Sequence, residues 1–150
     1  MTTLQARFES RIAVRAYELD SQGHVNRTVY LQYAEHARWA CLREAGIDHA
    51  RLLATGTGPV TLEERIRFHR ELRAGDEVVV SCALNWGQGK TMRVEQDFHR
   101  ADGTLVAELT SVVGLLDLQE RRLVPDPGEL LRSLATAPEL IGLEPTGRSE

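Results

Sequence analysis

Hydrophobic and polar residues alternate along much of this chain, as they do in β-strands that bury one face. In the segment 60–72, for example, Ile66 and Phe68 share one parity, and the positions between and beside them are charged. This pattern is typical of a half-buried strand. The segments predicted to be strands on these grounds are 7–17, 60–72, 77–86, 91–100 and 104–118.

The pattern changes between residues 28 and 45, where no Gly or Pro occurs and the composition favours a helix. Gly46 follows as a helix stop. Small residues recur in this segment at spacings of three and four, so they line one face of the helix. Such a face lets another backbone approach closely, and we therefore expect a sheet to wrap around this helix. The stripe consists of Ala34, Ala37, Cys41 and Ala45.

The predicted elements follow one another as one strand, one long helix and four strands joined by short turns, such as the one at Asp102-Gly103. Short connections imply antiparallel pairing. The predicted fold is therefore α+β, with a five-stranded antiparallel sheet around one long central helix. Residues 1–137 are expected to form a single domain with a short helix at 129–134. The segment 138–150, which contains Pro and Gly, is expected to be a flexible tail.

Composition narrows the classes of function. The 150 residues suit one domain, with 42% hydrophobic and 27% charged residues. A formal net charge of -4 excludes a generally basic nucleic-acid binder. No apolar run approaches about 20 residues and no secretory signal opens the chain, which predicts a cytoplasmic protein without a membrane partner. Cys41 and Cys82 form neither a disulfide framework nor a zinc spacing, and no metal or cofactor is expected.

The segment 17–30 carries the candidate chemistry. A polar loop with Asp20, His24 and Asn26 ends where the long helix begins. A helix N-terminus has unpaired N–H groups and a partial positive charge, which stabilise an anion or an oxyanion that develops during a reaction. Each residue also has a structural interpretation: the carboxylate can cap a turn, the imidazole can be solvated, and Asn26 can be the N-cap of the helix.

These residues also form part of a longer pattern that resembles a known family. The run from Asp20 through Gly23-His24-Val25-Asn26 to a helix with Glu and Arg resembles the hotdog-fold acyl-CoA thioesterases of the 4-hydroxybenzoyl-CoA thioesterase type. The helix residues that match are Tyr30, Leu31, Tyr33, Glu35 and Arg38, and the resemblance covers about residues 8–127. It implies a hotdog fold, hydrolysis of an acyl-CoA to a carboxylic acid and CoA, and a homodimer or homotetramer with its active sites where the sheets join.

The resemblance also implies roles for single residues. Asp20 matches the carboxylate that attacks the thioester carbonyl or activates water. The oxyanion donor matches the backbone N–H of Arg27, where many relatives have Asn; because the donor is backbone, the side chain can differ. His24 and Asn26 match positions that shape the loop or orient the substrate. Positions expected to contact the substrate are Gly23, Tyr30, Arg67, Lys90 and Thr91.

The sequence leaves alternatives open for the roles of two further carboxylates and for the function. Glu35 is expected to pair with Arg38 at spacing i,i+3, and Glu64 is expected to be structural, although either carboxylate can support a site. A non-catalytic acyl-CoA-binding module and a thioesterase acting on acyl-carrier-protein both remain open, because a fold does not decide a function. A hotdog dehydratase fits less well, because those sites carry different His-containing motifs.

Overall fold

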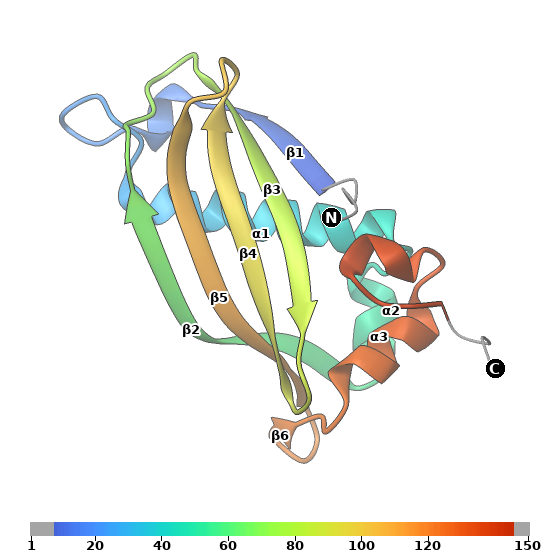
Figure 1. Ribbon diagram of the computed structural model, residues 1–150. Helices are drawn as coiled ribbons and strands as arrows, with labels where there is room; N and C mark the ends of the chain where they lie inside the picture. The colour runs from blue at the N-terminus through green and yellow to red at the C-terminus, as the bar shows by residue number, and fades with distance from the viewer. Residues whose placement is uncertain (1–7, 146–150) are drawn as a thin grey trace.

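The computed structural model describes residues 8–145, which form one curved antiparallel sheet with a long helix on one side (Figure 1). The strands are β1 Phe8–Ala13, β2 Thr57–Phe68, β3 Glu77–Trp86, β4 Thr91–Arg100, β5 Leu105–Asp117 and β6 Arg122–Leu123. The α-helices are α1 Arg27–Glu44, α2 His49–Ala54 and α3 Pro127–Leu134, and the 3₁₀ helices are η1 Ala16–Glu18 and η2 Pro138–Ile141.

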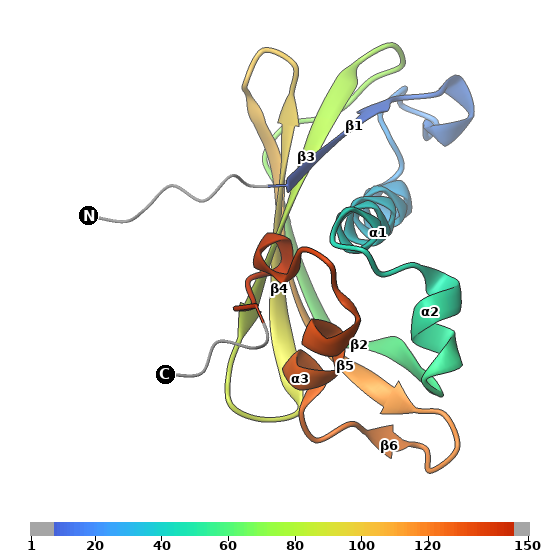
Figure 2. The ribbon, with the colours of Figure 1, turned by 90° about the vertical axis from the view of Figure 1, so that its right-hand side faces the viewer.

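The sheet has the strand order β1-β3-β4-β5-β2, and the two-residue β6 pairs with β5. Every pairing is antiparallel. Figure 2 views α1 almost along its axis and shows it against one side of the curved sheet, with α2 beside it. The predicted α+β arrangement of a curved sheet and one long helix is confirmed, and β6 is an addition that the sequence pattern did not indicate.

The stripe of small residues on α1 faces the sheet, as predicted. Ala34, Ala37, Cys41 and Ala45 are all completely buried. Their small volume allows the helix axis to lie close to the strands, so that larger side chains of β3, β4 and β5 fill the space around it. Cys41 and Cys82 are both free thiols within this core, in agreement with their expected role as small buried hydrophobes.

Strand β2 differs from the half-buried strand that its alternation indicated. It lies at the edge of the sheet and pairs only with β5, so Leu62 and Phe68 remain about half exposed. A register shift between Thr61 and Glu63 inserts one residue into the strand. After this bulge, Glu64 shares its parity with Ile66 and Phe68, on the side of the strand that faces α1.

The segment after residue 137, predicted to be a flexible tail, packs onto the core as far as it is described. Ile141 is completely buried, and its carbonyl accepts a hydrogen bond from the indole N–H of Trp86 at 2.6 Å. Pro138, one of the residues that suggested a tail, instead begins the turn η2, which Gly142 caps. Residues 146–150 of the predicted tail lie outside the described residues.

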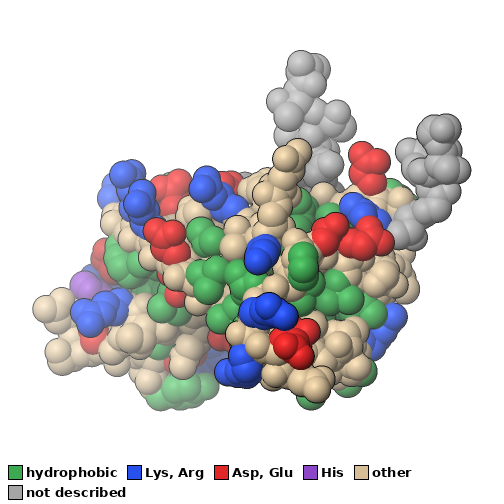
Figure 3. All heavy atoms as spheres, turned by 90° about the horizontal axis from the view of Figure 1, so that it is seen from below, with side chains coloured by type: hydrophobic (Ala, Val, Ile, Leu, Met, Phe, Trp, Pro, Cys, Tyr) green, Lys and Arg blue, Asp and Glu red, His purple; other side chains and the backbone are tan. Residues whose placement is uncertain are grey.

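The lower end of the molecule in Figure 1 exposes apolar side chains. Figure 3 looks directly onto it and shows hydrophobic side chains gathered between charged ones. Leu118, in the connection between β5 and β6, is an exposed hydrophobic residue. Its amide donates a hydrogen bond to the carbonyl of Gly56 at 2.9 Å. Across residues 8–145, no helix is both long enough and apolar enough to cross a membrane.

Candidate active site

The loop that carries the candidate chemistry is a closed turn projecting from one end of the molecule (Figure 1). Leu19 and Val25 form an isolated antiparallel bridge at its base, and the amide of Asp20 donates to the carbonyl of His24 at 2.6 Å. Gly23 has φ +81°, and a Cβ there would meet no atom within 4 Å. Glycine is therefore needed for the backbone conformation rather than for lack of space.

The carboxylate of Asp20 is held by the loop through one oxygen only. Its Oδ1 accepts the backbone N–H of Gln22 at 2.8 Å and that of His24 at 3.1 Å. Its Oδ2 has no hydrogen bond to any of the residues described. The Gln22 amide, then the His24 amide, lower the pKa of Asp20 below its ordinary value; these two effects outweigh desolvation, which raises it. The group is therefore an ionised carboxylate at neutral pH with one oriented and one open oxygen.

The N-terminus of α1 leaves a single backbone amide open. Oδ1 of Asn26 accepts the backbone N–H of Thr28 at 3.0 Å, and the carbonyl of Asn26 accepts that of Val29 at 2.9 Å. The amide of Arg27 has no hydrogen bond within the described part of the chain. Asn26 is thus the N-cap of the helix. The cap satisfies the neighbouring amides and leaves the amide of Arg27 as the available donor for an anion.

Asp20 and Arg27 line the same surface hollow, which has a volume of about 430 Å³. The side chain of Asp20 itself is exposed to solvent in the single chain. The hollow is lined in addition by a segment that follows β2, namely His69, Arg70 and Glu71. Arg70 and Glu71 were not identified from the sequence, because they lie about 50 positions from Asp20 and carry no motif. The amide of Val25 donates to the carbonyl of Leu72 at 2.8 Å, and this contact brings the two segments together.

Tyr30 also lines this hollow, although most of its side chain is buried beneath the surface. Its side chain is 3% exposed, and burial is the main reason that its pKa is raised. The ring packs edge-on against Phe68 and Phe98, with centroids 5.1 and 5.6 Å away. Tyr30 therefore supports Phe68 and lines the hollow together with it, and a contact of Tyr30 with the substrate stays a prediction.

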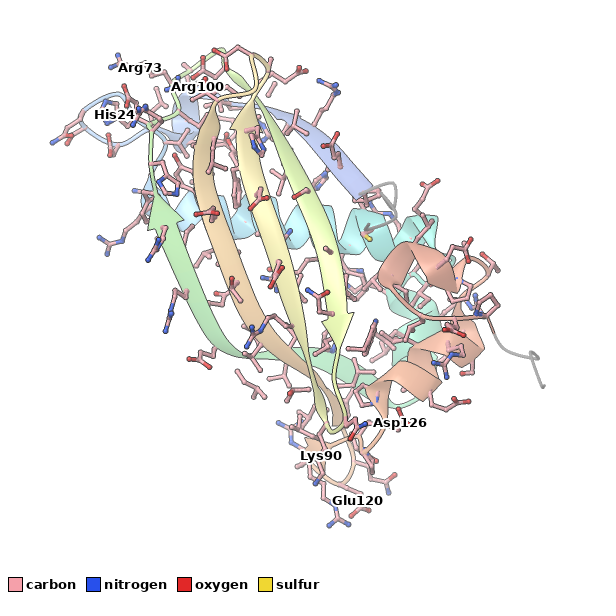
Figure 4. All side chains as sticks on the ribbon, in the orientation of Figure 1. His24, Arg73, Lys90, Arg100, Glu120 and Asp126 are labelled. Atoms are coloured by element: carbon pink, nitrogen blue, oxygen red, sulfur yellow. The ribbon has the colours of Figure 1, made fainter. Side chains whose placement is uncertain are left out.

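Two of the expected substrate contacts lie at the opposite end of the sheet. Figure 4 shows Lys90 at the lower end of the molecule and His24 at the upper end. Thr91 and Arg100 are the two ends of β4, which spans about 30 Å at 3.3 Å per residue. One chain therefore does not bring Lys90 and Thr91 to the hollow of Asp20. Arg67 lies nearer, but alternation along β2 directs it to the face opposite Phe68.

Arg38 pairs with Glu64 and not with Glu35, which corrects the expectation from helical spacing. One guanidinium nitrogen, Nη2, donates to Glu64 Oε2 at 3.1 Å and to Ser111 Oγ at 2.7 Å, and Nε donates to Gln96 Oε1 at 2.9 Å. Helical spacing could not indicate these partners, because they lie 26, 58 and 73 positions from Arg38 in the sequence. Arg38 and Glu64 line a second, larger cavity of about 540 Å³ beside α1.

Within residues 8–145, no group of three or more His, Cys, Asp or Glu side chains is arranged to hold a metal ion. The chemistry that the arrangement around Asp20 offers is that of an ionised carboxylate and a backbone oxyanion donor on the walls of one hollow.

Comparison with known proteins supplies the family. The model of the thioesterase-like superfamily matches residues 14–134. The long-chain acyl-CoA thioesterase FadM of Escherichia coli is 27% identical over 127 residues, which cover 84% of this chain and 96% of FadM. The chloroplastic acyl-acyl carrier protein thioesterase ATL3 of Arabidopsis thaliana is 35% identical over 77 residues; the match spans 51% of this chain but only 40% of ATL3.

One solved structure is similar to this chain in both sequence and fold. The crystal structure of YbaW, a probable thioesterase from Escherichia coli, superposes with a TM-score of 0.74 at 28% identity, covering 84% of this chain and 94% of YbaW. The residues that the family model matches contain the loop of Asp20, α1 and the strands β2 to β6. From its sequence over most of its length and from its curved sheet and helix, this chain belongs to the thioesterase-like superfamily and has the hotdog fold.

Proposed function

We propose that this protein is a thioester hydrolase that cleaves an acyl-CoA to a free carboxylic acid and CoA. The observation that carries the proposal is the pairing, in one hollow, of the open oxygen Oδ2 of Asp20 with the open backbone amide of Arg27. The motif around Asp20 favours the finer assignment to the 4-hydroxybenzoyl-CoA thioesterase type. A likeness to FadM, named a long-chain acyl-CoA thioesterase, supports CoA as the thiol.

In the proposed mechanism, the carbonyl oxygen of the thioester accepts the amide N–H of Arg27, which stabilises the negative charge that develops on it. The carboxylate of Asp20 then attacks the carbonyl carbon. The C–S bond breaks, CoA leaves as a thiolate that takes up a proton, and water hydrolyses the resulting anhydride. Alternatively, the carboxylate accepts a proton from a water molecule, whose oxygen attacks the carbonyl carbon directly. Both routes require the ionised form that the loop amides favour.

His24 and Asn26 take positioning roles in this proposal. The backbone N–H of His24 orients the carboxylate, and its imidazole adds positive charge beside it. Asn26 caps α1 and thereby leaves the amide of Arg27 unoccupied. The side chains of Arg27 and Arg70 supply positive charge at the hollow, which suits the phosphates of CoA in an otherwise acidic protein.

A second candidate substrate is a thioester on acyl-carrier-protein. It is favoured by the 35% identity to ATL3, which is named an acyl-acyl carrier protein thioesterase. The two substrates share the acyl group and the phosphopantetheine arm, so the same Asp20 chemistry would serve both. Steady-state kcat/KM for one acyl group presented on CoA and on carrier protein distinguishes them.

We further propose that the active unit is a homo-oligomer, at least a dimer joined along β2. This strand is the edge of the sheet, and Leu62 and Phe68 on it are about half exposed. Unpaired edges are prone to pair with another strand, and a second copy would cover both apolar residues. Lys90, Thr91 and Arg67 remain proposed contacts for CoA only in such an assembly. Sedimentation velocity of the intact protein measures the state directly.

The experiment that tests the function measures free-thiol release from aryl, short-chain and long-chain acyl-CoAs, for the wild type and for Asp20→Asn. We expect at least one thioester to be hydrolysed, with kcat falling by about 10²–10⁴-fold in the variant. Binding of acyl-CoAs without hydrolysis of any of them would instead support a binding module. Equal turnover by Asp20→Asn would remove Asp20 from the chemistry.

A further inference from the structure

The larger cavity beside α1 is shaped like a binding site for an elongated group. Its volume of about 540 Å³ lies in the range of roughly 300–1,000 Å³ that small-molecule sites occupy. Most of its wall is apolar and comes from every layer of the fold. Its apolar lining includes Leu31 and Trp39 of α1, Leu52 of α2, Met92 of β4 and Leu131 of α3. Glu35, His49 and Thr61 line it as well, beside Arg38 and Glu64.

A fixed polar pair interrupts this apolar wall. Arg38 and Glu64 both line the cavity, and they are joined at 3.1 Å. Gln96 and Ser111, which are completely buried, hold the guanidinium in place. Because the pair is anchored on β4 and β5 as well as on α1, its position in the cavity is set by the core of the fold.

The polar pair retains unused hydrogen-bonding atoms. Nη1 of Arg38 donates no hydrogen bond, and Oε1 of Glu64 accepts none, to any of the described residues. The hydrogen bonds of Arg38 to Glu64 and Ser111 use Nη2, and those that Glu64 accepts end on its Oε2. A group that enters the cavity therefore meets two joined side chains that still have a free donor and a free acceptor. A hydroxyl satisfies both, because it accepts and donates, whereas a carboxylate would be opposed by Glu64 and a cation by Arg38.

The distance between the Arg38–Glu64 pair and the proposed reaction centre determines where along a substrate chain such a hydroxyl would lie. The cavity begins at Leu31, one helical turn after Arg27. Gln96 donates to the carbonyl of Ala34 at 3.0 Å, so the guanidinium it holds lies near the turn of Ala34. Ala34 lies about 10 Å from Arg27 along the helix axis. An extended chain advances about 1.2 Å per bond, so this span corresponds to about nine bonds.

We propose that this cavity holds the acyl chain of the substrate and that Arg38 and Glu64 select a chain with a hydroxyl group about nine carbons from the thioester carbonyl. The inference rests on the proposed thioester hydrolysis and names its substrate class. The apolar wall binds the rest of the chain, and the polar pair distinguishes hydroxylated from unsubstituted chains of equal length. A substrate hydroxyl there replaces the water that otherwise solvates both side chains.

Glu64→Met tests the pair with least damage to the fold. Methionine keeps the length of the side chain and removes the carboxylate, while Arg38 keeps its bonds to Gln96 and Ser111. Glu63→Met is the matched control, because Glu63 is the adjacent glutamate on β2, is exposed and does not line the cavity. Both variants alter the net charge equally, so a difference between them reports the position of the carboxylate.

The experiment measures kcat/KM for matched dodecanoyl-CoAs: unsubstituted, hydroxylated near the thioester, and hydroxylated about nine carbons away. We expect the distal hydroxyl to raise kcat/KM by about ten- to a hundredfold in the wild type and in Glu63→Met. In Glu64→Met the ratio should fall towards one. Non-hydrolysable thioether analogues of the same chains, measured by calorimetry, should show the same order of Kd.

The outcomes separate this inference from the proposed function. Asp20-dependent hydrolysis with equal kcat/KM for all three chains overturns the inference and leaves the thioesterase assignment in place. Retention of the preference in Glu64→Met also overturns it. If no thioester is hydrolysed, the thioesterase assignment fails, and the Kd values of the analogues then decide whether the cavity selects a hydroxylated chain.

Discussion

Oδ1 of Asn26 accepts the backbone N–H of Thr28 at 3.0 Å, and this contact leaves the preceding amide, that of Arg27, open at the start of α1. Asn26→Asp should preserve the cap, because aspartate accepts the same hydrogen bond and favours a helix N-terminus. The added negative charge should oppose the developing oxyanion. We therefore expect an unchanged or slightly raised Tm with kcat lowered by about tenfold or more.

Loss of the cap itself gives the control for this comparison. Asn26→Ala should lower the free energy of unfolding by about 1 kcal/mol. Asp126 caps α3 through the amide of Glu129 at 3.1 Å, and Asp126→Ala should cost a similar amount of stability while leaving the reaction centre intact. Urea denaturation and steady-state kinetics on the same preparations separate the two effects. Full activity of Asn26→Asp would exclude Arg27 as the oxyanion donor.

The pH dependence of the reaction should reflect the lowered pKa of Asp20. The amides of Gln22 and His24 stabilise the ionised carboxylate, so this form persists below the ordinary pKa of about 3.9. Activity needs that form and is lost only as the pH falls through the lowered value. We expect kcat/KM to stay level from pH 7 to about pH 4, in samples whose circular dichroism shows a folded chain. An acidic limb centred well above pH 4, in contrast, would show that a group other than Asp20 limits the reaction.

Gln96 should be more important for stability than its uncharged side chain suggests. It is completely buried, accepts from Arg38 Nε at 2.9 Å and donates to the carbonyl of Ala34 at 3.0 Å. Gln96→Leu leaves both partners without their hydrogen bond, and we expect the free energy of unfolding to fall by about 1–3 kcal/mol. Urea denaturation measures it. Stability equal to the wild type would mean that Arg38 is held by Ser111 and Glu64 alone.

The small-residue stripe of α1 should tolerate no enlargement. Ala37 is completely buried against the sheet, so Ala37→Leu should lower the free energy of unfolding by about 1–3 kcal/mol through overpacking. Arg43→Leu introduces the same side chain on the exposed side of the same helix, where nothing is overpacked, and should alter stability by no more than about 0.5 kcal/mol. Thermal denaturation of both variants checks the difference, and equal effects would contradict tight packing at Ala37.

Local signals were sufficient for much of the fold. The strands β3 and β4 occupy the predicted residues 77–86 and 91–100, because the first is rich in β-branched residues, the second alternates, and each ends at a Gly-containing turn. The N-cap role of Asn26 was one of two interpretations open at the sequence level. The signal was weaker after residue 137, where Pro138 and Gly142 resemble a loop in sequence but build a packed turn.

In the candidate site, too, some features follow from the sequence and others from the tertiary structure alone. The sequence by itself determined the loop of Asp20, the helix that follows it and the small residues on its buried face, because each depends on neighbours within a few positions. Only the tertiary structure decided that His69 and Arg70 join Asp20 in one hollow, that Lys90 lies at the other end of the sheet, and that Arg38 pairs with Glu64. These contacts depend on strand register and on the bulge in β2, and a one-residue shift in register reverses which face a side chain occupies.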